Sequence, residues 1–147
     1  MISKIRKAVN EDINEIADIW LMSMRSAHYG FKDTYWTKQY KSIRHKYSQE
    51  RSDVVVYEEG GAILGFGAYI RDAGVVRIFV IPGFQKKGIG SALLTYFEEH
   101  YEGFLCRCYR TCAPAVSFLQ NRGYTRIERR NNVDSGQEEY VFRKGEA

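Results

Sequence analysis

The 147-residue sequence has no run of about 18 consecutive apolar residues, so it predicts no membrane-spanning helix. Its first residues include basic side chains, but no apolar segment follows them, and no secretory signal is expected. Repeats and low-complexity segments are also lacking. Because 44% of the residues are hydrophobic, the chain can bury a core. Its length suits one domain over residues 1–147, and we expect that domain to be cytoplasmic.

Cysteine is scarce, and Cys106, Cys108 and Cys112 form an odd, clustered set that does not suit a disulfide framework. A zinc site normally has four nitrogen or sulfur ligands. No fourth ligand stands beside this spacing, because the nearest histidine, His100, belongs to the preceding predicted helix. The sequence therefore predicts small buried thiols and no metal.

Charge of one sign does not dominate, because 22 basic and 18 acidic residues give a net charge of +4. This balance suits an anionic ligand without requiring nucleic acid. Arg126, Arg129 and Arg130 form a basic group, but Glu128 interrupts it and it lacks the interleaved aromatic residues on which bases stack. Neither nucleic-acid nor membrane partners are expected.

Hydrophobic periodicity predicts the element order β-α-α-β-β-β-α-β-α-β-β, a mixed α/β fold built on one sheet. Asp12 is expected to cap the first helix, with Glu15 at capping-box spacing. The strand over 75–81 is nearly all apolar, which indicates a central strand that is covered on both faces. The other predicted elements are strands over 2–9, 54–57, 62–70, 104–109, 124–130 and 138–143, and helices that begin near 33, 90 and 114.

A glycine-rich segment, Gly83-Phe84-Gln85-Lys86-Lys87-Gly88-Ile89-Gly90, joins the strand over 75–81 to the next helix. The first turn of a helix has N–H groups without partners inside the helix, and the helix dipole adds positive character there. Glycines let the backbone approach a ligand closely. The segment therefore predicts an anion site, with the two lysines at its rim.

Two other kinds of phosphate loop do not fit this segment. A Walker A loop requires a lysine and then Ser or Thr, where Ile89 and Gly90 stand. A Rossmann loop requires a third glycine, where Leu93 stands, and it follows an early strand of a βαβ unit.

The remaining pattern, Q-x-x-G-x-G after an apolar strand that ends in V-x-P, resembles the GNAT superfamily, the GCN5-related N-acetyltransferases. The matching segments are 79–82, 85–90 and 91–94. A second family signature, A-x-x-F-[YL]-x-x-x-G-[FY], is met by residues 115–124. The predicted element order matches over the whole chain. The resemblance, to the small stand-alone bacterial type, implies a mixed, mostly antiparallel central sheet of about seven strands flanked by four helices.

This resemblance implies an acetyl-CoA-dependent N-acetyltransferase in which a primary amine attacks the acetyl group directly in a ternary complex. The main chain of Val80 or Ile81 would stabilise the oxyanion. Ile89 is expected to point its side chain into the core while its N–H faces the ligand. The residues implied in cofactor binding are Phe79, Val80, Gln85, Lys86, Lys87, Gly88, Ile89, Gly90, Ser91, Cys112, Ala115 and Phe118.

Two positions depart from the family pattern. Leu119 stands where members commonly have a proton-donating tyrosine, and Cys112 stands where many have an asparagine. Tyr109 and Tyr124 are candidate replacement acids, and unaided departure of the thiolate is the alternative. An acyl-enzyme on Cys112 is disfavoured, because no base is paired with it in the sequence.

His28 is the candidate general base, because histidine titrates near neutral pH and this residue lies in the helix connection that contributes to the family's acceptor pocket. Glu58 is a second candidate base. Tyr29 and Phe31 are expected to join His28 in the acceptor pocket. The acceptor would be a small-molecule or protein amine, and the protein a monomer or homodimer. The alternative function is a CoA-binding sensor with weak or no activity, which Leu119 favours.

Overall fold

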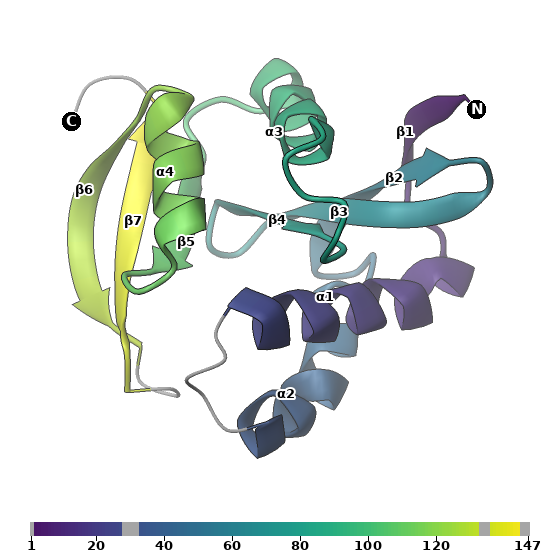
Figure 1. Ribbon diagram of the computed structural model, residues 1–147, viewed down its shortest axis with the longest axis horizontal. Coiled ribbons are helices and arrows are strands. Elements are labelled where there is room, and N and C mark those ends of the chain that lie inside the picture. The colour runs from purple at the N-terminus through teal and green to yellow at the C-terminus, as the bar shows by residue number, and fades with distance from the viewer. Residues whose placement is uncertain (1, 28–32, 133–135, 145–147) are drawn as a thin grey trace. The chain divides into compact units, whose positions relative to one another are not determined.

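A computed structural model describes residues 2–27, 33–132 and 136–144 of the chain (Figure 1). Its elements divide into two compact units, which meet in the sequence between His100 and Tyr101. We refer to them as the N-terminal and C-terminal units.

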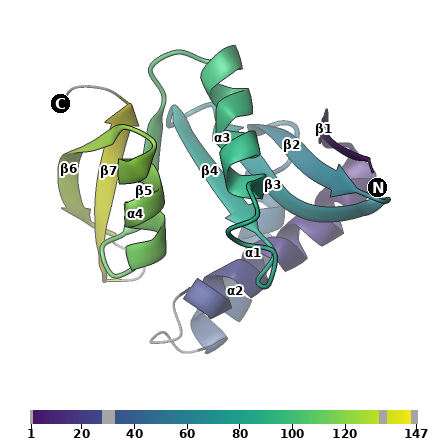
Figure 2. The ribbon, with the colours of Figure 1, turned by 45° about the horizontal axis from the view of Figure 1, so that its top comes forward.

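The described part of the N-terminal unit contains four antiparallel strands, which are neighbours in chain order. Figure 2 shows these strands side by side, with α3 lying across them. The elements of this unit are β1 (Ser3–Lys7), the 3-10 helix η1 (Asn10–Asp12), α1 (Ile13–Ala27), α2 (Asp33–Lys46), β2 (Ser52–Glu59), β3 (Ala62–Ile70), β4 (Val75–Val80) and α3 (Ile89–His100).

Helices cover both faces of this four-stranded sheet. α3 contacts β2, β3 and β4 on one face, while α1 contacts β3 and β4 from the other and packs on α2 (Figure 1). On the α1 side, Phe66 stacks on Phe79 with ring centroids 5.1 Å apart, and Tyr47 packs edge-on against both. β4 is therefore covered on both faces, as its apolar sequence predicted.

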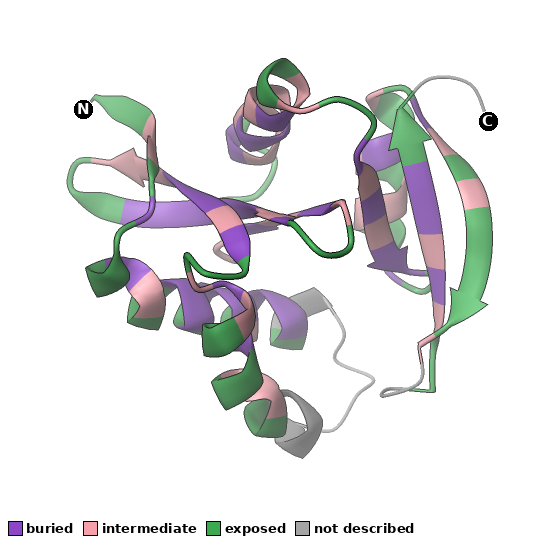
Figure 3. Cartoon of the chain, turned by 180° about the vertical axis from the view of Figure 1, so that it is seen from behind, coloured by how far each residue is buried: buried purple, intermediate pink, exposed green. Residues whose placement is uncertain are grey.

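The C-terminal unit contains β5 (Leu105–Tyr109), α4 (Ala113–Asn121), β6 (Tyr124–Asn131) and β7 (Glu138–Lys144). β7 lies between β5 and β6 and is antiparallel to both, and α4 packs on β6. The buried residues of β5, α4 and β7 form the interior of this unit, as the burial colours show (Figure 3). Cys106, Cys108 and Cys112 are buried and are not joined in disulfides.

The expected fold class is confirmed. The described residues form a mixed α/β structure with seven strands and four α-helices in the predicted order. Boundaries agree to within a few residues, and the sequence did not predict η1. None of the helices in the described ranges is both long and apolar enough to cross a membrane.

Candidate functional site

The predicted anion loop connects β4 to α3 and is exposed from Gly83 to Gly88. It is anchored at both ends. The Phe84 N–H donates to the Ile81 carbonyl at 3.0 Å, which closes a turn directly after β4. Ile89 is only 4% exposed, and its Cγ2 would lie 3.3 Å from a Cβ built on Gly65 of β3. The Ile89 side chain therefore points into the core, as expected.

The backbone of the loop alternates in the sign of φ. Lys86 has φ 64° and Gly88 has φ 86°, whereas Gln85, Lys87 and Ile89 are not in the positive region. Alternation between right- and left-handed backbone turns successive N–H groups towards one side, and such nests bind anions. The sequence indicated this shape through Gly88 but not through Lys86, since a lysine rarely adopts positive φ.

The start of α3 adds further donors to the same loop. The first bond within the helix runs from the Ala92 N–H to the Gly88 carbonyl at 3.0 Å, so the N–H groups of Ile89, Gly90 and Ser91 precede it. A Cβ added to Gly88 would meet no atom within 4 Å, so the space beside it is open. The loop thus fits an anionic group such as a pyrophosphate. Gly90 lies within α3 and does not have positive φ.

The register of β3 and β4 decides which main-chain groups of β4 face away from β3. The Ile81 N–H donates to the Leu64 carbonyl at 2.9 Å. Because the paired groups alternate along antiparallel strands, Phe79 also bonds to β3, while Val80 points to the opposite edge of β4. The Val80 N–H therefore faces away from β3, as the oxyanion role predicted for it requires. The N–H of Ile81, the other predicted donor, is already hydrogen-bonded to Leu64 of β3.

Phe79, which was also expected to bind the cofactor, contributes its ring to the core. Its ring is buried against Phe66 and Tyr47, and its main chain pairs with Phe66. A position that looks like part of the family motif is therefore a core residue here. The side chains of Phe79 and Val80 lie on opposite faces of the strand, because successive residues of a strand alternate.

Ser23 of α1 was missed by the sequence reasoning. Its side chain is buried, and its hydroxyl donates to the Val80 carbonyl at 3.1 Å. This bond fixes the end of β4 beside the predicted oxyanion donor. The available signal was a serine on the apolar stripe of a helix, between the buried residues Trp20 and Met24.

In the C-terminal unit, Cys112 immediately precedes α4, and its N–H donates to the Tyr109 carbonyl at 3.0 Å. Ala115 and Phe118 are half-buried on α4, and Leu119 is buried. Leu119 therefore occupies an interior position as a packing residue.

The two candidate acids have different surroundings. Tyr124 is buried, with its ring centroid 6.3 Å from that of Phe104. Tyr109 lies directly opposite Glu139 of β7. Glu139 is buried, with 5% of its surface exposed. The Arg110 N–H donates to the Glu138 carbonyl, so Tyr109 and Glu139 are a non-hydrogen-bonded pair, in which side chains approach most closely. Tyr109 is thus the candidate with a carboxylate as its cross-strand neighbour.

His28, Tyr29 and Phe31, predicted to form the acceptor pocket, lie outside the described residues. Glu58, the second candidate base, is described. Its carboxylate pairs with the Arg6 guanidinium at 3.1 Å and lies 3.6 Å from the Lys4 ammonium. These contacts tie β1 to β2, which gives Glu58 a structural role.

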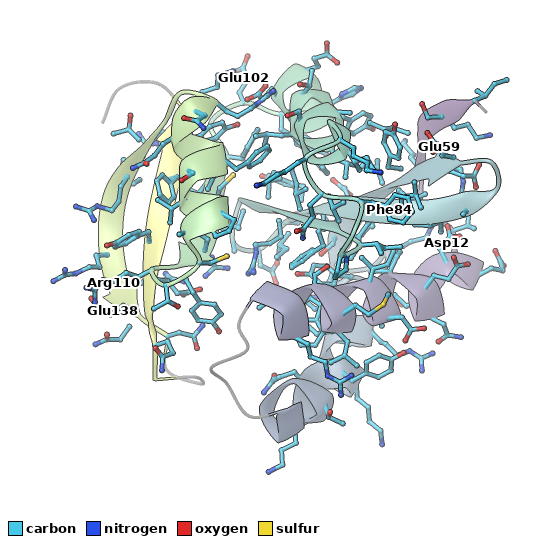
Figure 4. All side chains as sticks on the ribbon, in the orientation of Figure 1. Asp12, Glu59, Phe84, Glu102, Arg110 and Glu138 are labelled. Atoms are coloured by element: carbon cyan, nitrogen blue, oxygen red, sulfur yellow. The ribbon has the colours of Figure 1, made fainter. Side chains whose placement is uncertain are left out.

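The basic group on β6 is also engaged locally. Arg129 and Arg130 pair with Glu138 and Glu139 at 2.9 and 3.5 Å. The Arg126 guanidinium lies over the Tyr140 ring, 4.6 Å from its centroid. Figure 4 shows Glu138 beside Arg110, with which it forms a second ion pair.

Comparison with known proteins places these features in a family. The model of the acetyltransferase (GNAT) domain matches residues 50–126. The peptidyl-lysine N-acetyltransferase YiaC of Escherichia coli strain K12 is 29% identical over 120 residues, which is 82% of each chain.

Solved structures show the same fold. The apo form of YjaB from Escherichia coli superposes with a TM-score of 0.84 at 18% identity, over 100% of both chains. PaiA N-acetyltransferase from Thermoplasma acidophilum, solved in complex with coenzyme A, superposes with a TM-score of 0.77 at 20% identity, over 99% of this chain and 100% of PaiA. The family model covers more than half of the sequence, including the loop after β4 and all of α4. The chain therefore belongs to the GNAT family of acetyltransferases.

Proposed function

We propose that this protein transfers an acetyl group from acetyl-CoA to a primary amine by direct attack in a ternary complex. The observation that carries the proposal is the loop over 84–88, with its alternating φ and its open space at Gly88, placed directly before α3. The expected enzyme class and cosubstrate agree with the family, and PaiA holds coenzyme A. We also propose that both units form one acetyltransferase domain, since the family match runs across their boundary.

Each part of the proposed site has a physical task. N–H groups from Lys86 to Ser91 would hold the pyrophosphate, and Lys86 and Lys87 would add charge at the rim. Bound acetyl-CoA supplies the activated thioester. The Val80 N–H would donate to the carbonyl oxygen on which negative charge develops. Ser23 would keep that donor in place through its bond to the Val80 carbonyl.

We propose Tyr109 or Tyr124 as the general acid, with unaided departure of the thiolate as the alternative. The base is proposed to be His28, which also belongs to the proposed acceptor pocket with Tyr29 and Phe31. Cys112, Ala115 and Phe118 keep their proposed place along the cofactor.

We propose lysine side chains of peptides and small-molecule amines as the candidate acceptors. YiaC is a peptidyl-lysine N-acetyltransferase, so lysine side chains in peptides are the first acceptors to test. Small-molecule amines are the second group. We propose a cytoplasmic monomer or homodimer, with neither nucleic acid nor membrane as a partner.

Release of free thiol from acetyl-CoA, measured with lysine peptides and a panel of small amines, tests this function. Turnover above the rate of hydrolysis with at least one acceptor is expected, and whichever of Tyr109→Phe and Tyr124→Phe removes the acid should lower the turnover number at least about tenfold with cofactor affinity intact. An unchanged turnover number in both variants would favour unaided departure of the thiolate. Tight acetyl-CoA binding without turnover on any acceptor would favour the CoA-binding sensor. Failure to bind acetyl-CoA would overturn both functions.

A further inference from the structure

Phe84 is an exposed aromatic residue inside the proposed anion loop (Figure 4). Four large hydrophobic residues are exposed in the described ranges, and Phe84, at 38%, is the aromatic one among them. The other three, Ile2, Val9 and Met22, lie outside this loop. A large ring that remains in solvent beside a ligand cradle is a candidate contact for that ligand.

Two contacts within the loop hold Phe84 in place. Its backbone N–H bonds to the Ile81 carbonyl, which fixes the residue at the turn after β4. The Lys87 ammonium lies 5.3 Å from the ring centroid, at cation–π distance. The ring and the ammonium are therefore arranged together within the segment whose N–H groups form the cradle.

The chemistry of the cosubstrate identifies what such a ring could contact. The pyrophosphate of acetyl-CoA is joined on one side to the pantetheine arm and on the other to an adenosine that carries a 3′-phosphate. A purine has a flat π face and stacks readily on aromatic side chains. A pyrophosphate on residues 86–91 would therefore bring adenine close to an aromatic residue of the same loop.

We propose that Phe84 is the platform on which the adenine ring of acetyl-CoA stacks, with Lys87 holding the phenyl ring in position. This inference rests on the proposed function, because it requires acetyl-CoA in the loop. It goes further by assigning the recognition of the base to one side chain. Phe84 would then make the enzyme favour full CoA thioesters over shorter pantetheine thioesters.

The experiment compares three thioesters by calorimetry on the wild-type protein and on Phe84→Ala. They are acetyl-CoA, acetyl-dephospho-CoA, which retains adenine but lacks the 3′-phosphate, and acetyl-4′-phosphopantetheine, which lacks the whole nucleoside. Phe84→Ala should raise the dissociation constants of the first two by about tenfold and leave the third unchanged. Phe84→Trp should keep the affinity of the wild type for acetyl-CoA. Phe84→Leu, which is apolar but not aromatic, should lose affinity as Phe84→Ala does.

The outcomes separate this inference from the function on which it rests. Wild-type protein that fails to bind acetyl-CoA overturns the proposed function and the inference with it. Wild-type binding that Phe84→Ala leaves unchanged, or weakens equally for all three thioesters, overturns the inference alone. A loss for acetyl-CoA without a loss for acetyl-dephospho-CoA would also overturn it, because the 3′-phosphate and not adenine would then be the group recognised. Thermal melting of each variant checks that the fold is retained.

Discussion

Lys86 is the one non-glycine residue of the described ranges with positive φ, at 64°. A side chain in this region is disfavoured by contact between Cβ and the backbone, at a cost of about 1–2 kcal/mol. The residue lies in the middle of the proposed phosphate loop, where such strain is common because the ligand requires a special backbone shape. The loop therefore holds this conformation against the preference of its own sequence.

Lys86→Gly should be neutral or should stabilise the protein by up to about 1 kcal/mol, because glycine adopts positive φ without strain. Gln85→Gly is the matched control, since Gln85 is an exposed residue of the same loop that is not in the positive region. It should destabilise by about 0.5–1 kcal/mol. Urea unfolding of the two variants measures the difference. Equal destabilisation by both would show that Lys86 is not strained.

Gly88→Ala should weaken acetyl-CoA binding at least about tenfold, or ~1.4 kcal/mol, because the new methyl group enters space that the protein leaves open for the ligand. Gly83→Ala is the matched control. Gly83 also has positive φ, at 95°, and open space around it, so backbone strain is similar in both variants. Calorimetry should show a loss of affinity for Gly88→Ala alone. Similar losses in both would assign the effect to loop strain.

At the scale of elements, an ion-pair network ties β1, η1 and β2 together. Arg6 of β1 donates to both carboxylate oxygens of Asp12, at 2.8 and 3.1 Å, and to Glu58 of β2 at 3.1 Å. The Asp12 carboxylate also accepts the Val9 N–H at 2.9 Å. The Asp12 carboxylate therefore closes the start of η1 at Val9. The sequence had predicted that Asp12 would instead cap the helix that follows it. Hydrogen bonding from Arg6 lowers the pKa of Asp12 and raises that of Arg6.

Asp12→Asn should destabilise the protein by about 1–3 kcal/mol at neutral pH, because a buried charged hydrogen bond is lost. The folded-state pKa of Asp12 lies below its unfolded value of about 3.9, so its stabilisation is complete above that value. It is lost as the pH falls through the folded-state pKa. The difference between wild type and variant should therefore shrink in acid, as measured by urea unfolding at several pH values.

The exposed neighbour Glu11 provides the control for this experiment. Glu11→Gln should change stability by no more than about 0.5 kcal/mol. If the difference in the free energy of unfolding between wild type and Asp12→Asn stays constant down to pH 2, the assigned role of the carboxylate is contradicted.

The packing of α3 on β3 depends on Gly67. A Cβ at this position would lie 2.5 Å from the ring of Phe97, which is fully buried. Gly67→Ala should therefore destabilise by about 1–3 kcal/mol through overpacking. Phe97→Leu in the same chain should relieve part of that cost. If the losses of unfolding free energy caused by Gly67→Ala and Phe97→Leu simply add in the double variant, the new methyl group does not clash with the Phe97 ring. Denaturant unfolding measures these free energies.

For the whole molecule, acetyl-CoA should act as a stabilising ligand. At about 100 times its dissociation constant it should add ~2.7 kcal/mol, which raises the Tm of a chain of this length by about 5–10 °C. If both units form one domain, calorimetry should show a single transition that shifts as a whole. Two transitions, of which acetyl-CoA moves only one, would contradict the single domain. Gly88→Ala should reduce the shift at the same ligand concentration.

The sequence alone determined the order of the elements, most of their boundaries and the place of the anion loop. These features depend on local patterns, namely apolar periodicity and glycines at the junction of a strand and a helix. The buried position of Ile89 and the covered faces of β4 were predicted correctly for the same reason. The two signature segments were enough to indicate the family, because their spacing is local as well.

Only the tertiary structure decided which main-chain and side-chain groups near the loop are available to contact a ligand. The Ile81 N–H is used by Leu64, a partner that is distant in sequence and is fixed only by the strand register. The same register directs Phe79 into the core and Val80 away from β3. The bond from Ser23 to Val80 joins a helix to a strand 57 residues later in the chain. Local periodicity carries no information on such pairings, because they form only when distant segments meet on folding.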